Sequence, residues 1–281
     1  MALPFIPSDA GLLLVQAGVV AAPRRPPEIR QLVRFRNPTW AAVPIASIVG
    51  VVFLIRYASD TATALTYLAL VAVPPLAAVA LAWAMRGPAP GRPRTAAGVA
   101  VTGLLFGLAW AFRQSLTGEA AATLLSALSC VTLGVLLAAV APAGWLKVGI
   151  VAMAAADSWL VVSDLLQAPN ATLVAAQPAA NLPQLQSELF GSVSMGYGDM
   201  FVAGLLGAVL AADRRRQWRA ALLTLVLAGL FDLLFLTLSE LPATVPVALA
   251  LIGVEVSERV RPVSAGRRPW PRGDAIPRQA K

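Results

Sequence analysis

Histidine is absent from this 281-residue sequence, and the residues of several other catalytic centres are scarce. Without histidine there is no Ser–His pair, no histidine-bound zinc and no imidazole general base. Cys130 is the only cysteine, which excludes an intramolecular disulfide and a cysteine metal cluster. Charged residues make up 13% of the chain, whereas soluble domains carry about 25%. We therefore expect no metal and no cofactor, and a surface that does not face water.

Hydrophobic residues dominate what is present, at 58% of the chain with a mean hydropathy of +0.74. So few charges cannot cover a water-facing surface, and we expect the protein to be embedded in a lipid bilayer. The net charge is +8. In a soluble protein this excess would suggest nucleic acid, but in a membrane protein basic residues typically lie in cytoplasmic loops. No nucleic-acid partner is expected.

Long apolar runs predict an all-α membrane protein, a polytopic bundle of about nine transmembrane helices. A spanning helix needs about 20 apolar residues. We expect five N-terminal spans in residues 1–144, spans six to nine in 145–257, and a basic, disordered cytoplasmic tail in 258–281. The nine candidate spans are residues 8–22, 40–56, 63–85, 95–112, 120–141, 145–166, 189–211, 220–239 and 241–255.

The basic residues predict the orientation of these spans. Nine spans place all 22 Lys and Arg residues except Arg56 and Arg113 on one side of the membrane. The positive-inside rule makes that side the cytoplasm, so the N-terminus is expected outside and the C-terminus inside the cell. The Ala- and Arg-rich composition is typical of a prokaryote with a high-GC genome, which predicts the inner (plasma) membrane as the location.

Four aspartates fall within the predicted spans: Asp157, Asp164, Asp199 and Asp232. An ionisable group at the bilayer centre costs at least about 2.5–3.5 kcal/mol, which makes each one a functional hypothesis. With a helical rise of about 1.5 Å per residue, all but Asp164 are expected near mid-membrane. Asp164 lies about 10 Å further along the sixth span than Asp157, at the outer edge. The simpler alternative is an acid satisfied by a polar neighbour within a bundle.

Two short motifs accompany these acids. Glycines beside a membrane acid loosen the helix and allow another backbone to approach, as an extended peptide would need. Prolines leave backbone carbonyls without intrahelical donors, which a membrane tolerates where they face protein or a water-filled cavity. Each motif also has a simple reading, as small-residue helix packing or as a helix that starts with proline. The motifs are Gly196-Tyr197-Gly198-Asp199 and Leu241-Pro242-Ala243-Thr244-Val245-Pro246.

Together these features resemble presenilin and signal peptide peptidase, the intramembrane aspartyl proteases with nine spans. The resemblance covers residues 145–255: an Asp in the sixth span, a GxGD in the seventh, and a Pro-Ala-Leu-like element that opens the ninth. The expected topology is that of signal peptide peptidase. The sequence departs from the family at Ala156, where a Tyr usually precedes the first Asp, and at Thr244, where the family has Leu.

The resemblance implies an aspartic endopeptidase that cleaves membrane-spanning peptides. Asp157 and Asp199 would be the catalytic pair, with Asp157 rather than Asp164 as the partner of Asp199. Two carboxylates at the same depth on adjacent helices repel each other, so ionising both would cost free energy. The two carboxyls would therefore share one proton. An ionised carboxylate then activates water and a protonated one polarises the carbonyl. The substrate-binding residues would be Gly196, Tyr197, Gly198, Leu241, Pro242, Ala243 and Thr244.

Three other functions remain open at the level of the sequence. GYGD followed by an Ala/Gly-rich helix also resembles prepilin peptidases, although their two aspartates are separated by further spans and their zinc-binding cysteine segment is absent here. A proton-coupled transporter also places acids at mid-membrane near broken helices, and Asp232 fits this function better than the protease. An inert scaffold that keeps only the fold is the third alternative.

Overall fold

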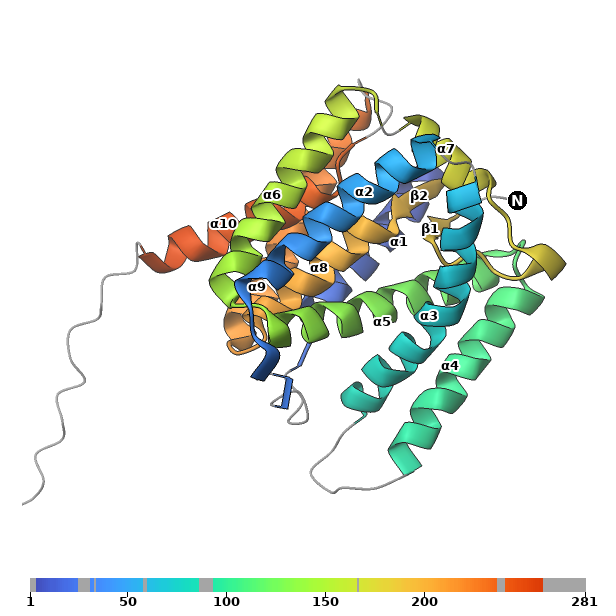
Figure 1. The fold of residues 1–281 in the computed structure, drawn as a ribbon, viewed down its shortest axis with the longest axis horizontal. Helices are drawn as coiled ribbons and strands as arrows, with labels where there is room; N and C mark the ends of the chain where they lie inside the picture. Colours follow the sequence, from blue (N-terminus) through green and yellow to red (C-terminus); the bar gives the residue numbers. More distant parts are fainter. Residues whose placement is uncertain are drawn as a thin grey trace, which may run out of the picture.

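The protein is mostly helical, and the predicted helical class is confirmed in the part of the chain that the structure describes (Figure 1). The computed structural model describes residues 4–24, 31–32, 34–57, 60–85, 93–165, 167–236 and 241–259. The predicted tail lies outside the described residues from residue 260 on, and residues 258 and 259 belong to the last helix. The α-helices are α1 (Phe5–Ala21), α2 (Val43–Tyr57), α3 (Asp60–Ala84), α4 (Pro93–Ala111), α5 (Leu116–Val140), α6 (Ala143–Val162), α7 (Gln167–Ala175), α8 (Tyr197–Leu210), α9 (Arg214–Phe231) and α10 (Thr244–Arg259).

Four of the described helices are long and apolar enough to cross a membrane: Asp60–Ala84, Leu116–Val140, Ala143–Val162 and Arg214–Leu234. Three further apolar helices, Phe5–Ala21, Thr95–Ala111 and Tyr197–Leu210, are shorter. Each of the nine predicted spans contains a helix. A membrane protein is thereby supported, whereas the count of nine spans stays a prediction.

Helix α5 is the centre of the packing and runs between the α3–α4 pair and α8 (Figure 1). Its contact with α8 is close because glycine lies on both sides. A Cβ on Gly134 would be 2.5 Å from the Gly204 carbonyl carbon, and a Cβ on Gly204 would be 2.5 Å from the Cys130 carbonyl oxygen. The two backbones therefore touch directly, as small residues allow in membrane helices.

Helix α1 packs against α8 and α9, and buried polar groups fix its C-terminal end. The last carbonyls of a helix have no intrahelical donors and need other partners. Gln217 of α9 is fully buried and donates to the Val20 and Pro23 carbonyls, while Arg214 donates to the Ala21 carbonyl. These bonds hold the C-terminal end of α1 against α9.

Charged residues join α6, α9 and α10 at one end of the bundle. Glu255 of α10 bonds Lys147 of α6 and Arg216 of α9, each at 2.7 Å, and Glu258 bonds Arg216 at 2.8 Å. Because several charges form one partly buried network, it contributes more than isolated surface pairs do. The network fixes α10 relative to α6, the two helices that build one side of the site described below.

The predicted seventh span is wrong in its first part. Residues expected to begin a helix at 189 form an antiparallel hairpin of β1 (Ser187–Phe190) and β2 (Val193–Gly196), paired from Ser187 with Gly196 to Phe190 with Val193. The cause is local: Gly191 adopts φ 64°, which favours glycine, and Val193, Ser194 and Met195 alternate apolar and polar with the period of a strand. Helix α8 begins only at Tyr197.

Candidate functional site

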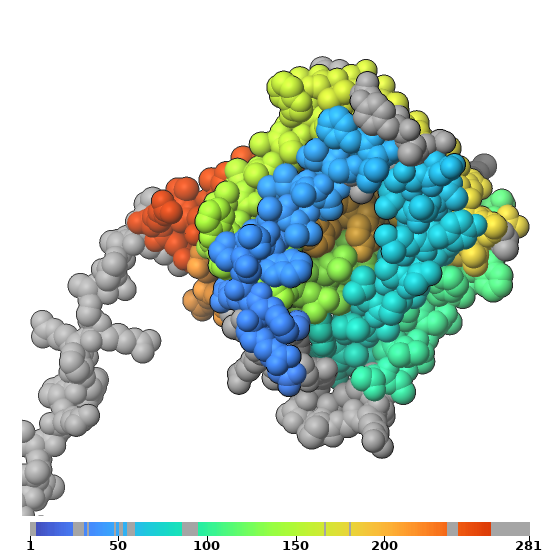
Figure 2. Space-filling view, viewed as in Figure 1, coloured from blue at the N-terminus to red at the C-terminus, as the bar shows by residue number. Residues whose placement is uncertain are grey.

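A cavity of about 1170 Å³ lies inside the bundle. Residues of α1, α2, α3, α5, α6, α7, α8, α9 and the hairpin line it, together with Asp232 just after α9 and the segment that opens α10. Figure 2 shows a hollow between α2 and α3, at the floor of which α8 and α5 are visible. The cavity is large enough for several residues of an extended chain.

Asp157 faces this cavity because it continues the buried stripe of α6. Leu146, Ile150 and Met153 are buried, and their spacing of four and three residues defines the helix face that looks into the bundle. Asp157, four residues further, lines the cavity on the same face. Its Oδ2 accepts a hydrogen bond of 2.6 Å from Thr244 Oγ1, and the Thr244 backbone donates to it as well.

The opening of α10 is shaped so that Thr244 can make these bonds. Thr244 is the first residue of the helix and is buried. The Val245 N–H turns back to the Pro242 carbonyl at 3.1 Å, and Pro246 falls in the first turn, where its missing N–H removes no helical bond. The Leu-Pro-Ala-Thr segment thus presents its hydroxyl to the sixth helix.

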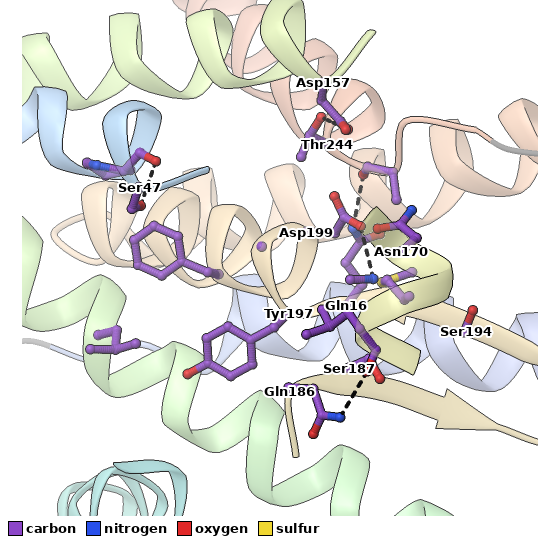
Figure 3. A pocket seen from close by; sticks show the side chains of 18 of the residues that line it. Gln16, Ser47, Asp157, Asn170, Gln186, Ser187, Ser194, Tyr197, Asp199 and Thr244 are labelled. Atoms are coloured by element: carbon purple, nitrogen blue, oxygen red, sulfur yellow. Dashed lines mark hydrogen bonds between the residues drawn. The ribbon is translucent and has the colours of Figure 1, made fainter. Parts of the chain in front are cut away.

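Asp199 lies in the first turn of α8, not in the middle of a span as predicted. Its Oδ2 accepts the Gly196 backbone N–H at 3.2 Å. A Cβ on Gly196 would stand 3.1 Å from that oxygen, so glycine at 196 leaves room for the carboxylate. The hairpin and the helix start together aim Asp199 into the cavity, where it faces Asp157 (Figure 3).

Tyr197 anchors this helix start to α5. Its hydroxyl shares a hydrogen bond of 2.6 Å with Ser129 Oγ, and its carbonyl accepts a weak bond from Cys130 Sγ at 3.8 Å. The tyrosine lines the cavity with its ring while its polar end is held by a neighbouring helix. Tyr197 is therefore suited to position Asp199 as well as to contact a ligand.

The structure brings together most of the residues predicted for the site. Asp157 and Asp199 line one cavity and interact electrostatically. Asp164 is exposed and is not among the lining residues, because α6 ends at Val162 and Asp164 leaves the helix with φ 55°. Of the predicted substrate-binding residues, Gly196, Tyr197, Gly198, Leu241, Ala243 and Thr244 line the cavity and Pro242 does not.

Several polar residues in or beside the site could not be identified from the sequence, and three of them carry ionisable or amide groups close to the aspartates or to the segment that opens α10. Gln16 and Asp9, both on α1, line the cavity, and Glu188 of β1 is fully buried close to Asp199. Asp9 and Asp232 line the same cavity and interact electrostatically. No local pattern marks Glu188 as buried, because it follows two polar residues in Gln186-Ser187-Glu188. Among the described residues, no group of three His, Cys, Asp or Glu side chains could hold a metal ion.

Glu188 should make stability depend on pH. Neither of its carboxyl oxygens has a hydrogen-bond partner among the described residues. Burial raises the pKa of Glu188 well above its usual range, and the charge of Asp199 raises it further. Between the unfolded pKa of about 4.3 and the raised folded pKa, the folded protein holds a proton that the unfolded chain has lost, so stability falls as pH rises through this window.

We therefore expect Glu188→Gln to gain stability relative to wild type as pH rises, because glutamine stays neutral in both states. The measurement is the difference in melting temperature between the variant and wild type, from pH 4 to pH 9 in detergent. The difference should grow in favour of the variant with increasing pH. A difference that is constant across the range would show that Glu188 does not titrate in this window.

No protein-family model, no curated protein and no solved structure matches the chain.

Proposed function

We propose that the protein is an intramembrane-cleaving aspartyl protease that hydrolyses peptide bonds within transmembrane segments, a member of the presenilin and signal peptide peptidase class with nine spans. The observation that carries this proposal is the placement of Asp157 and Asp199, which come from different helices, face one cavity and interact electrostatically. The two aspartates are far apart along the chain, and the packing of the helices brings them to the same cavity. A chain without histidine has few other groups that could activate water at neutral pH.

The chemistry needs one protonated and one ionised carboxyl. The ionised carboxylate removes a proton from water as the oxygen attacks the scissile carbonyl carbon, and the protonated carboxyl donates to the carbonyl oxygen. The tetrahedral intermediate collapses as the carboxyl that is now ionised takes a proton from one of its hydroxyls, the C–N bond breaks, and the nitrogen takes a proton from the other carboxyl, which restores the pair with one shared proton. Thr244 fixes Asp157 and Gly196 fixes Asp199, so neither side chain must be ordered during the reaction.

The substrate must be unwound, because a helix hides its amide groups in internal hydrogen bonds. The hairpin supports this step, since strands accept an added strand at an unpaired edge. Ser192, Val193, Ser194 and Met195 of the hairpin line the same cavity as the aspartates. An extended segment of a membrane-spanning peptide is thus the substrate class that fits the site.

The direct experiment is reconstitution. The purified protein is placed in liposomes with a synthetic single-span peptide, and the products are identified by mass spectrometry. Two new fragments that meet at a bond within the apolar segment are expected. If a panel of such peptides stays intact while the liposomes show proton flux, the protein is not a protease of this class.

We further propose that the protein lies in the inner membrane of a prokaryote with its N-terminus outside, on the basis of its basic loops. Reporter fusions after residues 60, 90, 180 and 281 are expected to be outside, inside, outside and inside. An external signal at 90 or 281 would contradict this orientation.

Proton-coupled transport is the second candidate, and one observation favours it. Asp9 and Asp232 form a second acid pair in the cavity that holds Asp157 and Asp199. Two carboxyl groups close to each other in one cavity can share a proton, so this pair could take up and release one. Buried acids in a membrane cavity commonly mark proton pathways.

A further inference from the structure

Gln16 of α1 is a buried polar side chain for which the two-aspartate mechanism has no role. Its side chain is only 1% exposed, and it lines the cavity together with Asp157 and Asp199 (Figure 3). Its Nε2 donates to the Ala243 carbonyl at 3.1 Å. Its Oε1 has no hydrogen-bond partner among the described residues. One end of the amide therefore holds the segment that opens α10, and the other end is an unused acceptor.

A hydrogen-bond acceptor that is buried inside the bundle without a donor needs an explanation. A buried oxygen without a donor costs free energy, and methionine would fill the same space without that cost. The rest of the buried face of α1 is largely apolar, with Leu12, Leu13, Val19 and Val20. By contrast, Gln186, which also lines the cavity, accepts the Leu185 N–H with Oε1 and donates to backbone carbonyls with Nε2. The acceptor of Gln16 therefore fits a donor that arrives with a ligand.

We propose that Gln16 Oε1 accepts a hydrogen bond from a backbone N–H of the bound peptide, close to the scissile bond. This inference rests on the proposed protease function. A peptide within a helix has no N–H to offer, because each one is already bonded to a carbonyl of the same helix. An unwound peptide offers one N–H per residue, so Gln16 binds only the form of the substrate that can be cleaved.

The position of this contact follows from the segment that Gln16 holds. Gln16 binds the carbonyl of Ala243, and the next residue, Thr244, binds Asp157. Because these two contacts are made by neighbouring residues, and an extended chain advances about 3.3–3.6 Å per residue, the N–H that meets Gln16 lies within a few residues of the bond that is cleaved. Gln16 thus sets the register of the peptide against the aspartate pair, and acts as a substrate-binding residue from a helix outside the catalytic half of the chain.

The test uses peptides in which one amide is replaced by an ester, which removes a single N–H and keeps the shape. A set of single-span peptides carries the ester at each position from three residues before to three residues after the cleaved bond, and kcat/KM is measured in liposomes. With wild type, one of these positions should lose about tenfold in kcat/KM, the effect of one buried hydrogen bond. With Gln16→Met, the peptide that carries this ester should be cleaved with the same kcat/KM as the all-amide peptide.

Gln186→Met is the matched control, because it also removes a cavity-lining glutamine, but one whose amide is fully paired; the sensitive position should persist in it. Gln16→Asn, which withdraws the amide by one methylene, replaces Gln16→Met if the latter does not fold. The inference is overturned if wild type cleaves all peptides without a sensitive position, or if the sensitive position remains in both Gln16 variants. If wild type cleaves none of the all-amide peptides, the proposed protease function itself fails.

Discussion

Asp157→Asn and Asp199→Asn should each abolish cleavage of a reconstituted membrane peptide while the protein stays folded. Asparagine keeps the size and shape of the side chain but cannot take a proton from water or share one with its partner. General acid–base catalysis contributes about 10²–10⁴ per group, so kcat should fall by at least that factor in each single variant. Because the two carboxyls act as one unit, the double variant should lose little more than either single variant.

The measurement is the rate of product formation by mass spectrometry, with circular dichroism and melting temperature as the test of folding. Asp164→Asn is the matched control, since Asp164 is exposed outside the cavity and should retain wild-type activity. Asp232→Asn should retain substantial activity, because the protease mechanism gives Asp232 no step. Full activity in Asp157→Ala would refute the assignment of the pair. Loss of function in Asp232→Asn alone, with measurable proton flux in wild type, would favour transport.

The sequence predicted the helices well because their signal is local. Long apolar runs and the bilayer thickness are enough to place a helix in each of the nine segments. The two aspartates and the Leu-Pro-Ala-Thr segment were also found, because ionisable and helix-breaking residues are conspicuous in an apolar chain. The partner of Asp199 was predicted from helical rise, and the structure adds a second reason: α6 ends before Asp164, which therefore points away from the cavity.

The polar residues of the site could not be predicted, because their burial depends on distant contacts. Gln16 meets Ala243 across 227 residues, and nothing around Gln16 distinguishes it from a polar residue on any helix. Glu188 looks like the charged end of a connector, yet the packing of β1 against α5 buries it completely. The hairpin was missed because its apolar residues continue into α8 and were counted as one run.

Gly204→Ala should destabilise the protein and also impair catalysis. The added Cβ would lie 2.5 Å from the Cys130 carbonyl oxygen, so α5 and α8 must separate by several tenths of an ångström along their crossing. Overpacking of this kind typically costs about 1–3 kcal/mol of unfolding free energy. The same shift moves Asp199 on α8 away from Ser129 and Cys130, which hold its helix start. A misplacement of about 1 Å can reduce the rate about 10²-fold.

Gly107→Ala in α4 is the matched control, since a Cβ there would meet no atom within 4 Å. Alanine is favoured over glycine in a helix by about 0.5–1 kcal/mol, so this variant should melt at the wild-type temperature or above it. Melting in a single detergent compares both variants. Gly134→Ala combined with Gly204→Ala should cost less than the sum of the two, because the first separation of the helices makes room for the second methyl group. If Gly204→Ala instead melts like wild type and cleaves at the wild-type rate, then α5 and α8 do not meet backbone to backbone, and Asp199 is held by the hairpin alone.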